Sequence, residues 1–358
     1  MADVYTELAK KLDELPQGFP ATESGLELKI LRKIFTQEEA EMALKIKPIP
    51  ETAEAIAERV GKPLPEMQAI LDDMVEKGQI GSFKLFAQQM YMFFPFVVGI
   101  YEFQGDRLDK ELAEMFEEYL PTLVRKVGGF TPAMARVVPV ETVVEGDMLV
   151  HRYEDVRRMI DEAKSFELHD CICRVEQALE GNPCKHTVDI CLGISNEEDG
   201  YSRYEVGKVI SKEEAFKVLE KAEEEGLVHC TYNVQMGQTF VCNCCPCCCG
   251  ILRGAKDFNA PYMLAKSNFM ALVDPDGCTQ CGVCADERCP MDAIVEEGGE
   301  YRVLPKRCIG CGVCVPTCPT EAITLVRRSE SEQDTPPADL IDWSVQRAGT
   351  RGVKLELD

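Results

Sequence analysis

Apolar residues recur at helical spacing through most of the first 125 positions of the chain. Thr36 with Glu39 forms a capping-box signal, Pro121 is expected to end the last helix, and residues 80–100 change to aromatic and β-branched residues that suit strands. The spacing predicts helices within residues 1–20, 28–35, 36–44, 53–60, 67–77 and 105–125.

The order of these N-terminal elements resembles that of a winged-helix domain: helix, helix, turn, helix, then a β ribbon. Winged helices invite the hypothesis of DNA binding. The expected recognition helix argues against it, because Glu66, Asp72, Asp73 and Glu76 outnumber the single Lys77, whereas phosphate contacts need Lys or Arg. We therefore expect residues 1–136 to dock a protein or to be purely structural.

Strands and helices alternate in the middle of the chain. Residues 137–144 read as a strand, residues 156–163 as a helix, and residues 227–230 and 239–241 as strands. Ser211 and Glu214 form a second capping box, which predicts a helix that ends at Gly226. The pattern as a whole predicts an α+β protein.

Nineteen cysteines are the unusual feature of the composition. In two C-terminal runs, CTQCGVCADERCP and CIGCGVCVPTCP, the first three cysteines recur at an offset of 30 residues, and each run closes with Cys-Pro. A C-x-x-C-x-x-C loop presents three thiolates to three corners of an iron–sulfur cubane. Zinc usually takes two pairs of ligands, and disulfides need an oxidising compartment, so both are weaker readings.

Residues 273–326 resemble the bacterial two-cluster ferredoxin domain on these motifs. The resemblance implies two 4Fe-4S clusters, with the cysteine of each Cys-Pro pair completing the other cluster. One departure is the first run, which has four residues (285–288) before its Cys-Pro where the second run has three. The implied ligand sets are Cys278, Cys281, Cys284 and Cys318 for one cluster, and Cys308, Cys311, Cys314 and Cys289 for the other.

A second cysteine set lies in residues 168–192, in the order C-x-C-R, then two single cysteines. Four cysteines this close together in a reducing compartment usually bind metal. A 4Fe-4S cluster is the first interpretation and structural zinc is the alternative, while Arg174 either donates to a cluster sulfur or lies on the surface. The set is Cys171, Cys173, Cys184 and Cys191.

The third set is the run CNCCPCCC, in which Pro246 bends the chain. Alternate side chains of an extended segment point to opposite faces, so one run can supply thiolates to two neighbouring centres. The sequence leaves three partitions open: completion of a cluster with the second set, a cluster of its own, or an unusual cluster of more than four irons. The cysteines are Cys242, Cys244, Cys245, Cys247, Cys248 and Cys249.

Charge and hydropathy limit the partners. The formal net charge is −23, which disfavours nucleic acid and anionic lipid and predicts redox partners that dock through basic patches. The N-terminal stretch lacks the apolar region of a signal peptide, and the longest apolar run, residues 91–101, is too short to span a bilayer. We therefore expect a cytoplasmic protein with no membrane span.

Four regions follow from these patterns: residues 1–136, winged-helix-like; 137–268, cysteine-rich; 269–328, the two-cluster segment; and 329–358, a polar linker and tail with the only tryptophan, Trp343. Residues 137–326 also resemble a group of iron–sulfur proteins of strict anaerobes, which implies redox work as one chain of a complex. We found no G-x-G-x-x-G, Walker or flavin motif and no nucleophile with its base.

The leading hypothesis is an electron-transfer subunit of a larger oxidoreductase complex, whose partner chain carries a flavin or a metal. It predicts two 4Fe-4S clusters and one or two further iron–sulfur clusters upstream. Two alternatives stay open. One is a redox-sensing winged-helix regulator, and the other is an iron–sulfur enzyme that binds substrate at a cluster within residues 171–249.

Overall fold

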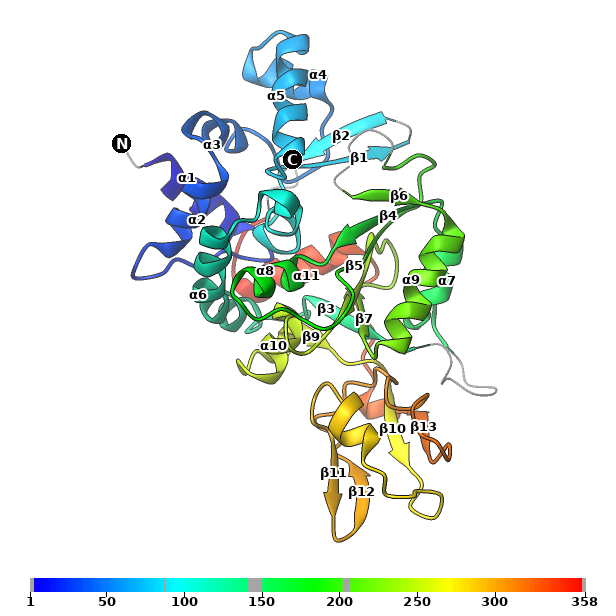
Figure 1. Ribbon diagram of the computed structural model, residues 1–358. Coiled ribbons are helices and arrows are strands. Elements are labelled where there is room, and N and C mark those ends of the chain that lie inside the picture. Colours follow the sequence, from blue (N-terminus) through cyan, green and yellow to red (C-terminus); the bar gives the residue numbers. More distant parts are fainter. Residues whose placement is uncertain (1–2, 87, 141–149, 202–206, 356–358) are drawn as a thin grey trace.

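The computed structural model describes residues 3–86, 88–140, 150–201 and 207–355. Helices and strands mix along the chain, as expected for the α+β class. Figure 1 shows a central sheet, a helical N-terminal part on one side of it, and a C-terminal segment that projects from the rest.

The N-terminal part is helical with one β hairpin. Thr36 accepts a hydrogen bond from the Glu39 backbone while the Glu39 side chain accepts one from the Thr36 backbone, which confirms the predicted capping box. β1 and β2 pair as an antiparallel hairpin, and an isolated bridge joins Glu51 to Tyr91 beside it. The elements are α1 (Val4–Glu14), α2 (Leu26–Ile34), α3 (Gln37–Ala43), α4 (Ala53–Val60), α5 (Leu64–Glu76), β1 (Gly81–Leu85), β2 (Gln88–Met92) and α6 (Lys110–Val127).

The prediction that the last of these helices ends at Pro121 is wrong, because α6 continues to Val127. An interior proline costs a helix about 3 kcal/mol. Beyond it, Leu123, Val124 and Val127 continue the buried face of the helix. Burying each of these side chains contributes about 1.5–3 kcal/mol, so together they outweigh the proline.

The central sheet has seven strands within the described residues, in the order β6-β4-β5-β8-β7-β3-β9. All neighbours are antiparallel except β3 and β9, which are parallel. The predicted strand at residues 137–144 corresponds in part to β3, since residues 141–149 lie outside the described residues. The strands are β3 (Ala135–Val138), β4 (Ser165–Asp170), β5 (Asp189–Ser195), β6 (Lys208–Ile210), β7 (Val228–Tyr232), β8 (Phe240–Cys244) and β9 (Leu264–Ala265).

Four helices accompany the sheet. α7 (Val156–Glu162) and α9 (Lys212–Glu224) lie side by side (Figure 1), and α9 carries the capping box predicted from Ser211 and Glu214. α8 (Ile172–Leu179) follows β4 directly, and α10 (Gly250–Lys256) follows the turn after β8. Cys171 and Cys249 are the N-cap residues of α8 and α10. The two cysteine-rich stretches lie in the same region, since the sulfurs of Cys184 and Cys245 are 3.8 Å apart.

The projecting C-terminal segment contains two antiparallel sheets of two strands each. β10 (Phe269–Val273) pairs antiparallel with β13 (Ile323–Arg327), and β11 (Ile294–Glu297) pairs with β12 (Glu300–Val303). A backbone hydrogen bond of 3.1 Å from Val140 to the Cys311 carbonyl joins this segment to the chain just after β3.

The last helix, α11 (Leu340–Arg351), returns to the N-terminal part of the molecule. Trp343 is buried in the same core as Leu8 and Phe116, and its indole N–H donates to the Ala133 carbonyl at 2.8 Å. Arg347 is also buried and donates to the carbonyls of Pro16 and Phe130 at 3.0 and 2.7 Å. The tryptophan of the tail therefore packs against its own chain.

Candidate metal centres

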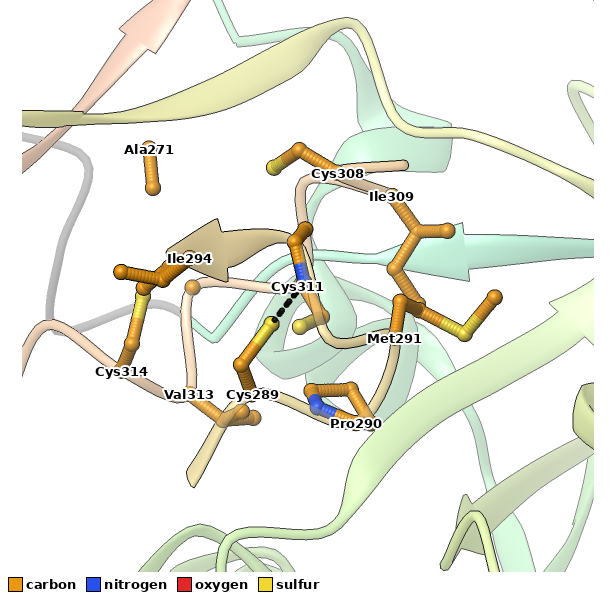
Figure 2. Close-up of a pocket in the computed structure, with 12 residues that line it drawn as sticks. Ala271, Cys289, Pro290, Met291, Ile294, Cys308, Ile309, Cys311, Val313 and Cys314 are labelled. Atoms are coloured by element: carbon orange, nitrogen blue, oxygen red, sulfur yellow. Dashed lines mark hydrogen bonds between the residues drawn. The ribbon is translucent and has the colours of Figure 1, made fainter. Parts of the chain in front are cut away.

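Four cysteines from both C-terminal runs line one cavity, here called the inner cavity. Figure 2 shows Cys289, Cys308, Cys311 and Cys314 around it, with Met291, Ile294 and Val313 among the apolar lining residues. Three of these thiols come from one run and the fourth from the Cys-Pro of the other. This is the grouping that the ferredoxin resemblance implies.

The other four cysteines line a second cavity, here called the outer cavity. Cys278, Cys281, Cys284 and Cys318 surround it, together with Tyr301. Two cavities of equal thiol content indicate two similar occupants.

The backbone repeats the duplication seen in the sequence. The Cys289 thiol accepts a hydrogen bond from the Ala293 backbone at 3.1 Å, and the Cys318 thiol accepts one from the Ala322 backbone at 3.2 Å. Left-handed residues also recur at the 30-residue offset, with φ of 57° at Gln280 and 72° at Gly310. Both loops therefore turn backbone N–H groups toward sulfur in the same way.

The extra residue of the first run is absorbed by a wider turn. Residues Cys284–Arg288 form a π turn, in which the Cys289 backbone donates to the Cys284 carbonyl five positions earlier. In the second run the Cys318 backbone donates to Val315, three positions earlier. The longer gap thus leaves Cys289 in line with the inner cavity.

The two cavities differ in exposure. Cys308, Cys311 and Cys314 of the inner cavity are all buried, whereas Cys281 of the outer cavity is exposed. Burial, with the neighbouring Cys314, raises the pKa of the Cys311 thiol well above its ordinary value. A buried thiolate at this position needs a compensating positive charge.

The residues present fit an iron–sulfur cluster in each cavity. Each offers four thiols and backbone N–H donors to sulfur, with no competing carboxylate among the lining residues. Thiolate ligands select iron–sulfur clusters and other soft metals.

The upstream cysteines divide into two groups, and the run at residues 242–249 contributes to both. The first, here called the four-thiol group, has ligand atoms that all lie within 4.8 Å of one another. The Cys184 Sγ is 3.8 Å from that of Cys245 and 3.6 Å from that of Cys247. Its members are Cys184, Cys245, Cys247 and Cys248.

The second group, here called the six-thiol group, joins strands β5 and β8 to the starts of α8 and α10. Neighbouring thiols of the group shift one another's pKa: Cys191 and Cys244 raise the pKa of Cys242, while Cys173 and Cys191 lower the pKa of Cys171. Six thiols exceed the four of a single cubane. The members are Cys171, Cys173, Cys191, Cys242, Cys244 and Cys249.

Cys184 therefore shares its group with Cys245, Cys247 and Cys248 rather than with the three other cysteines of the predicted set at residues 171–191. Cys230, which no sequence motif marks as a ligand, is fully buried, lies opposite Cys242 in the β7–β8 register and adjoins the six-thiol group. Its thiol hydrogen bond is the largest cause of the raised pKa of Cys244, about 11. Pairing the strand at residues 227–230 with the strand before the cysteine run would have placed it here.

Arg174 lies between the two upstream groups. It is buried, and it donates to the carbonyls of Thr187 and Asn243 at 2.7 and 2.9 Å. Burial alone lowers its pKa, but the charges of Cys171 and Cys245, one from each group, raise it above the ordinary value. From the sequence, Arg174 was expected either to donate to a cluster sulfur or to lie on the surface. The structure places it in the interior, close to cysteine thiols.

Comparisons with known proteins agree with the C-terminal geometry. Residues 270–320 match the family model of the 4Fe-4S dicluster domain. A ferredoxin of Rickettsia felis is 41% identical over 83 residues, which cover 22% of this chain and 63% of the relative. A ferredoxin of Saccharopolyspora erythraea is 49% identical over 37 residues, covering 10% of this chain and 35% of the relative.

A third relative is one of the subunits of the Na⁺-translocating ferredoxin:NAD⁺ oxidoreductase complex of Acetobacterium woodii. It is 44% identical over 55 residues, which cover 15% of this chain and 16% of the relative. The chain thus spans less than two thirds of the length of each of these relatives. No solved structure matches it.

These findings confirm the predicted pair of 4Fe-4S clusters and support iron–sulfur electron transfer as the type of chemistry. Within the part of the chain that the structure describes, no helix combines the length and apolar character needed to cross a membrane.

Proposed function

We propose that this chain is the electron-transfer subunit of a larger oxidoreductase complex, with an electron route that starts at the outer cavity, continues at the inner cavity and ends at the six-thiol group. The iron–sulfur clusters supply the one-electron chemistry, and the protein sets their spacing, burial and docking. The ligands are the two C-terminal sets of four cysteines and, for a third cluster, members of the six-thiol group.

The observation that carries this proposal is a shared core between the inner cavity and the six-thiol group. Cys311 and Ile309 from the inner loop pack in the same buried cluster as Cys244, Cys249 and Cys230. Close-packed protein interiors hold few voids as large as a water molecule. A short, dry connection is what electron transfer between neighbouring centres requires.

The difference in exposure between the two cavities indicates which end of the route faces solvent. The outer cavity, with exposed Cys281, is where an external donor or acceptor can approach. Asp274, Asp276, Asp286 and Glu287 are exposed close to it in sequence. A partner with a basic docking patch is therefore favoured at this end, in line with the net charge of −23.

The N-terminal part fits a protein-docking role better than a DNA-binding one. Its order of α4, α5 and a hairpin, with the Glu51–Tyr91 bridge, supports a winged-helix-like arrangement. Lys77 at the end of α5 contacts Glu39 and Asp73 at 2.8 and 2.6 Å. A cation already paired with two carboxylates is a poor phosphate ligand.

Membership of a complex rests on the likeness to the Acetobacterium woodii protein. The matched 55 residues place a similar segment in one chain of a redox complex, although in a different chain context. We propose that the redox partner here likewise lies on another chain and carries a flavin or a metal.

The route is tested by removing one centre at a time from anaerobically purified protein. Cys281→Ala should disable the outer centre and Cys311→Ala the inner one, each with loss of up to about four irons. We would measure iron, sulfide and EPR spectra after reduction with dithionite. Neighbouring reduced centres broaden each other's signals by magnetic coupling.

In the native chain we expect about twelve irons in clusters, with a matching amount of sulfide, and a coupled spectrum. Cys281→Ala should keep the coupling between the inner and upstream centres, whereas Cys311→Ala should leave the remaining centres uncoupled. Coupling that survives Cys311→Ala, or a native chain with only about eight irons, would refute a route that runs through the inner cavity to the six-thiol group.

A further inference from the structure

The four-thiol group has a different geometry from every other cysteine site in the described residues. Cys184 comes from the loop between α8 and β5, and the other three members come from the tight turn between β8 and α10. Besides the two contacts of Cys184, the Sγ atoms of Cys247 and Cys248 are 3.5 Å apart. All four sulfurs lie within 4.8 Å of one another.

These separations are those of four ligands around one ion. Sulfurs held about 2.3 Å from a single metal at the corners of a tetrahedron lie about 3.8 Å apart. The three separations above, 3.8, 3.6 and 3.5 Å, are close to that value. In a cubane each thiolate binds its own iron, so the thiolates stand farther apart than around one ion.

The C-terminal segment supplies an internal comparison. Its eight cysteines surround two cavities, and in the ranges that the structure describes none of them belongs to a set of three ligand atoms within 4.8 Å. The same chain thus spaces its thiols around a cavity where clusters are expected and brings four of them together at the four-thiol group.

The charge of the surroundings suits a tetrathiolate ion. Four thiolates and one divalent ion carry a net charge of about −2, which is costly inside a protein unless cations are near. Arg174 is 1% exposed, its guanidinium interacts with the Cys245 thiol, and its Nε has no nitrogen or oxygen partner among the described residues. Lys185 adjoins Cys184 in sequence.

We propose that Cys184, Cys245, Cys247 and Cys248 bind a single tetrahedral metal ion of the zinc or mononuclear iron class, without inorganic sulfide. With four protein ligands the site is closed, which is the pattern of a structural ion. It links the loop after α8 to the turn after β8. This assignment is independent of the electron route proposed above.

The test is the metal and sulfide content of the full chain, produced anaerobically with both iron and zinc supplied. Cys247→Ala is the first variant because Cys247 is exposed, and Cys184→Ala is the second. Each should lose about one ion per chain while acid-labile sulfide stays unchanged. Cys281→Ala is the matched control, and it should lose iron and sulfide but keep that ion.

Replacement by Co²⁺ gives a second measurement that does not depend on a variant folding. In the native chain, cobalt at the four-thiol group should show the intense visible bands of a tetrahedral tetrathiolate site, and their absence would count against the proposal. Loss of one zinc identifies zinc, and loss of one iron without sulfide identifies mononuclear iron. Loss of iron together with an equal amount of sulfide in Cys247→Ala would overturn the proposal.

Discussion

The C-terminal segment and the upstream cysteine region hold eight and eleven thiols and assemble them in opposite ways. Each C-terminal cavity takes three thiols from one short loop and a single thiol from the other run. The six-thiol group draws on β5, β8 and the starts of α8 and α10. Local loops therefore define the first kind of site, and the global fold defines the second.

The largest effect is expected from a substitution that destabilises the global fold and leaves every thiol in place. Trp343→Ala empties a fully packed position in the N-terminal core and leaves the Ala133 carbonyl without its donor. Such a truncation typically costs about 3–5 kcal/mol of the free energy of unfolding. We expect upstream metal to be lost at lower denaturant than C-terminal cluster iron, measured by circular dichroism and metal release.

Ile341→Ala is the matched control on the same helix. Ile341 is 68% exposed, so its truncation should change stability by less than about 0.5 kcal/mol. If Trp343→Ala released cluster iron from both regions at the same denaturant concentration, the two regions would depend equally on the global fold and the comparison would fail.

This difference also explains what the sequence could predict. The three loop cysteines of each C-terminal set follow from spacing, because they lie within seven residues, whereas the crossed fourth ligand is what the ferredoxin resemblance implies. The partition at residues 171–249 does not follow from spacing, because Cys184 meets Cys245 only once the loop after α8 and the turn after β8 are placed. Cys230 carries no motif that marks it as a ligand, and only strand register brings it opposite Cys242.

Helices show the same limit. Capping boxes at Thr36 and Ser211 were readable because both partners are three residues apart. The continuation of α6 past Pro121 was not, because the decisive contribution comes from tertiary burial of Leu123, Val124 and Val127. Local signals predict local structure, and long-range packing can override them.

The two duplicated loops differ in the space that they leave for a side chain. Gly310 and Gln280 occupy equivalent positions, both with left-handed backbone. A Cβ at Gly310 would lie 2.2 Å from the Phe269 carbonyl oxygen, whereas Gln280 is exposed and already carries a side chain. Gly310→Gln should therefore cost about 2–4 kcal/mol through overpacking and backbone strain, and it should reduce iron by about four per chain.

Gln280→Gly, the reciprocal change, should leave iron content unchanged and alter the free energy of unfolding by about 1 kcal/mol or less. Iron analysis and thermal unfolding of both variants measure the contrast. Equal iron loss in the two variants would mean that the inner and outer loops are equally sensitive to substitution at this position. That result would contradict the close contact between Phe269 and the inner loop.

The smallest expected effect concerns a partly buried carboxyl group, Glu102, beside the upstream region. Burial raises the pKa of Glu102 from 4.5 to about 7, although its carboxylate accepts a hydrogen bond of 2.7 Å from the Gly99 backbone. Because the folded state holds this proton more tightly, its contribution to stability is complete below pH 4.5 and is lost as the pH rises through about 7.

Glu102→Gln keeps the acceptor for Gly99 and removes the titration. The variant should therefore lose the decline in the free energy of unfolding between pH 4.5 and 7, which is about 3 kcal/mol for this shift and about 1–2 kcal/mol once water screens the partly exposed carboxyl. Glu118→Gln, at an exposed position of α6, is the control and should keep the native slope. An unchanged slope in Glu102→Gln would show that the carboxyl reaches water in the folded state, and that the protein around Cys249 is less closed than the packing of the upstream region implies.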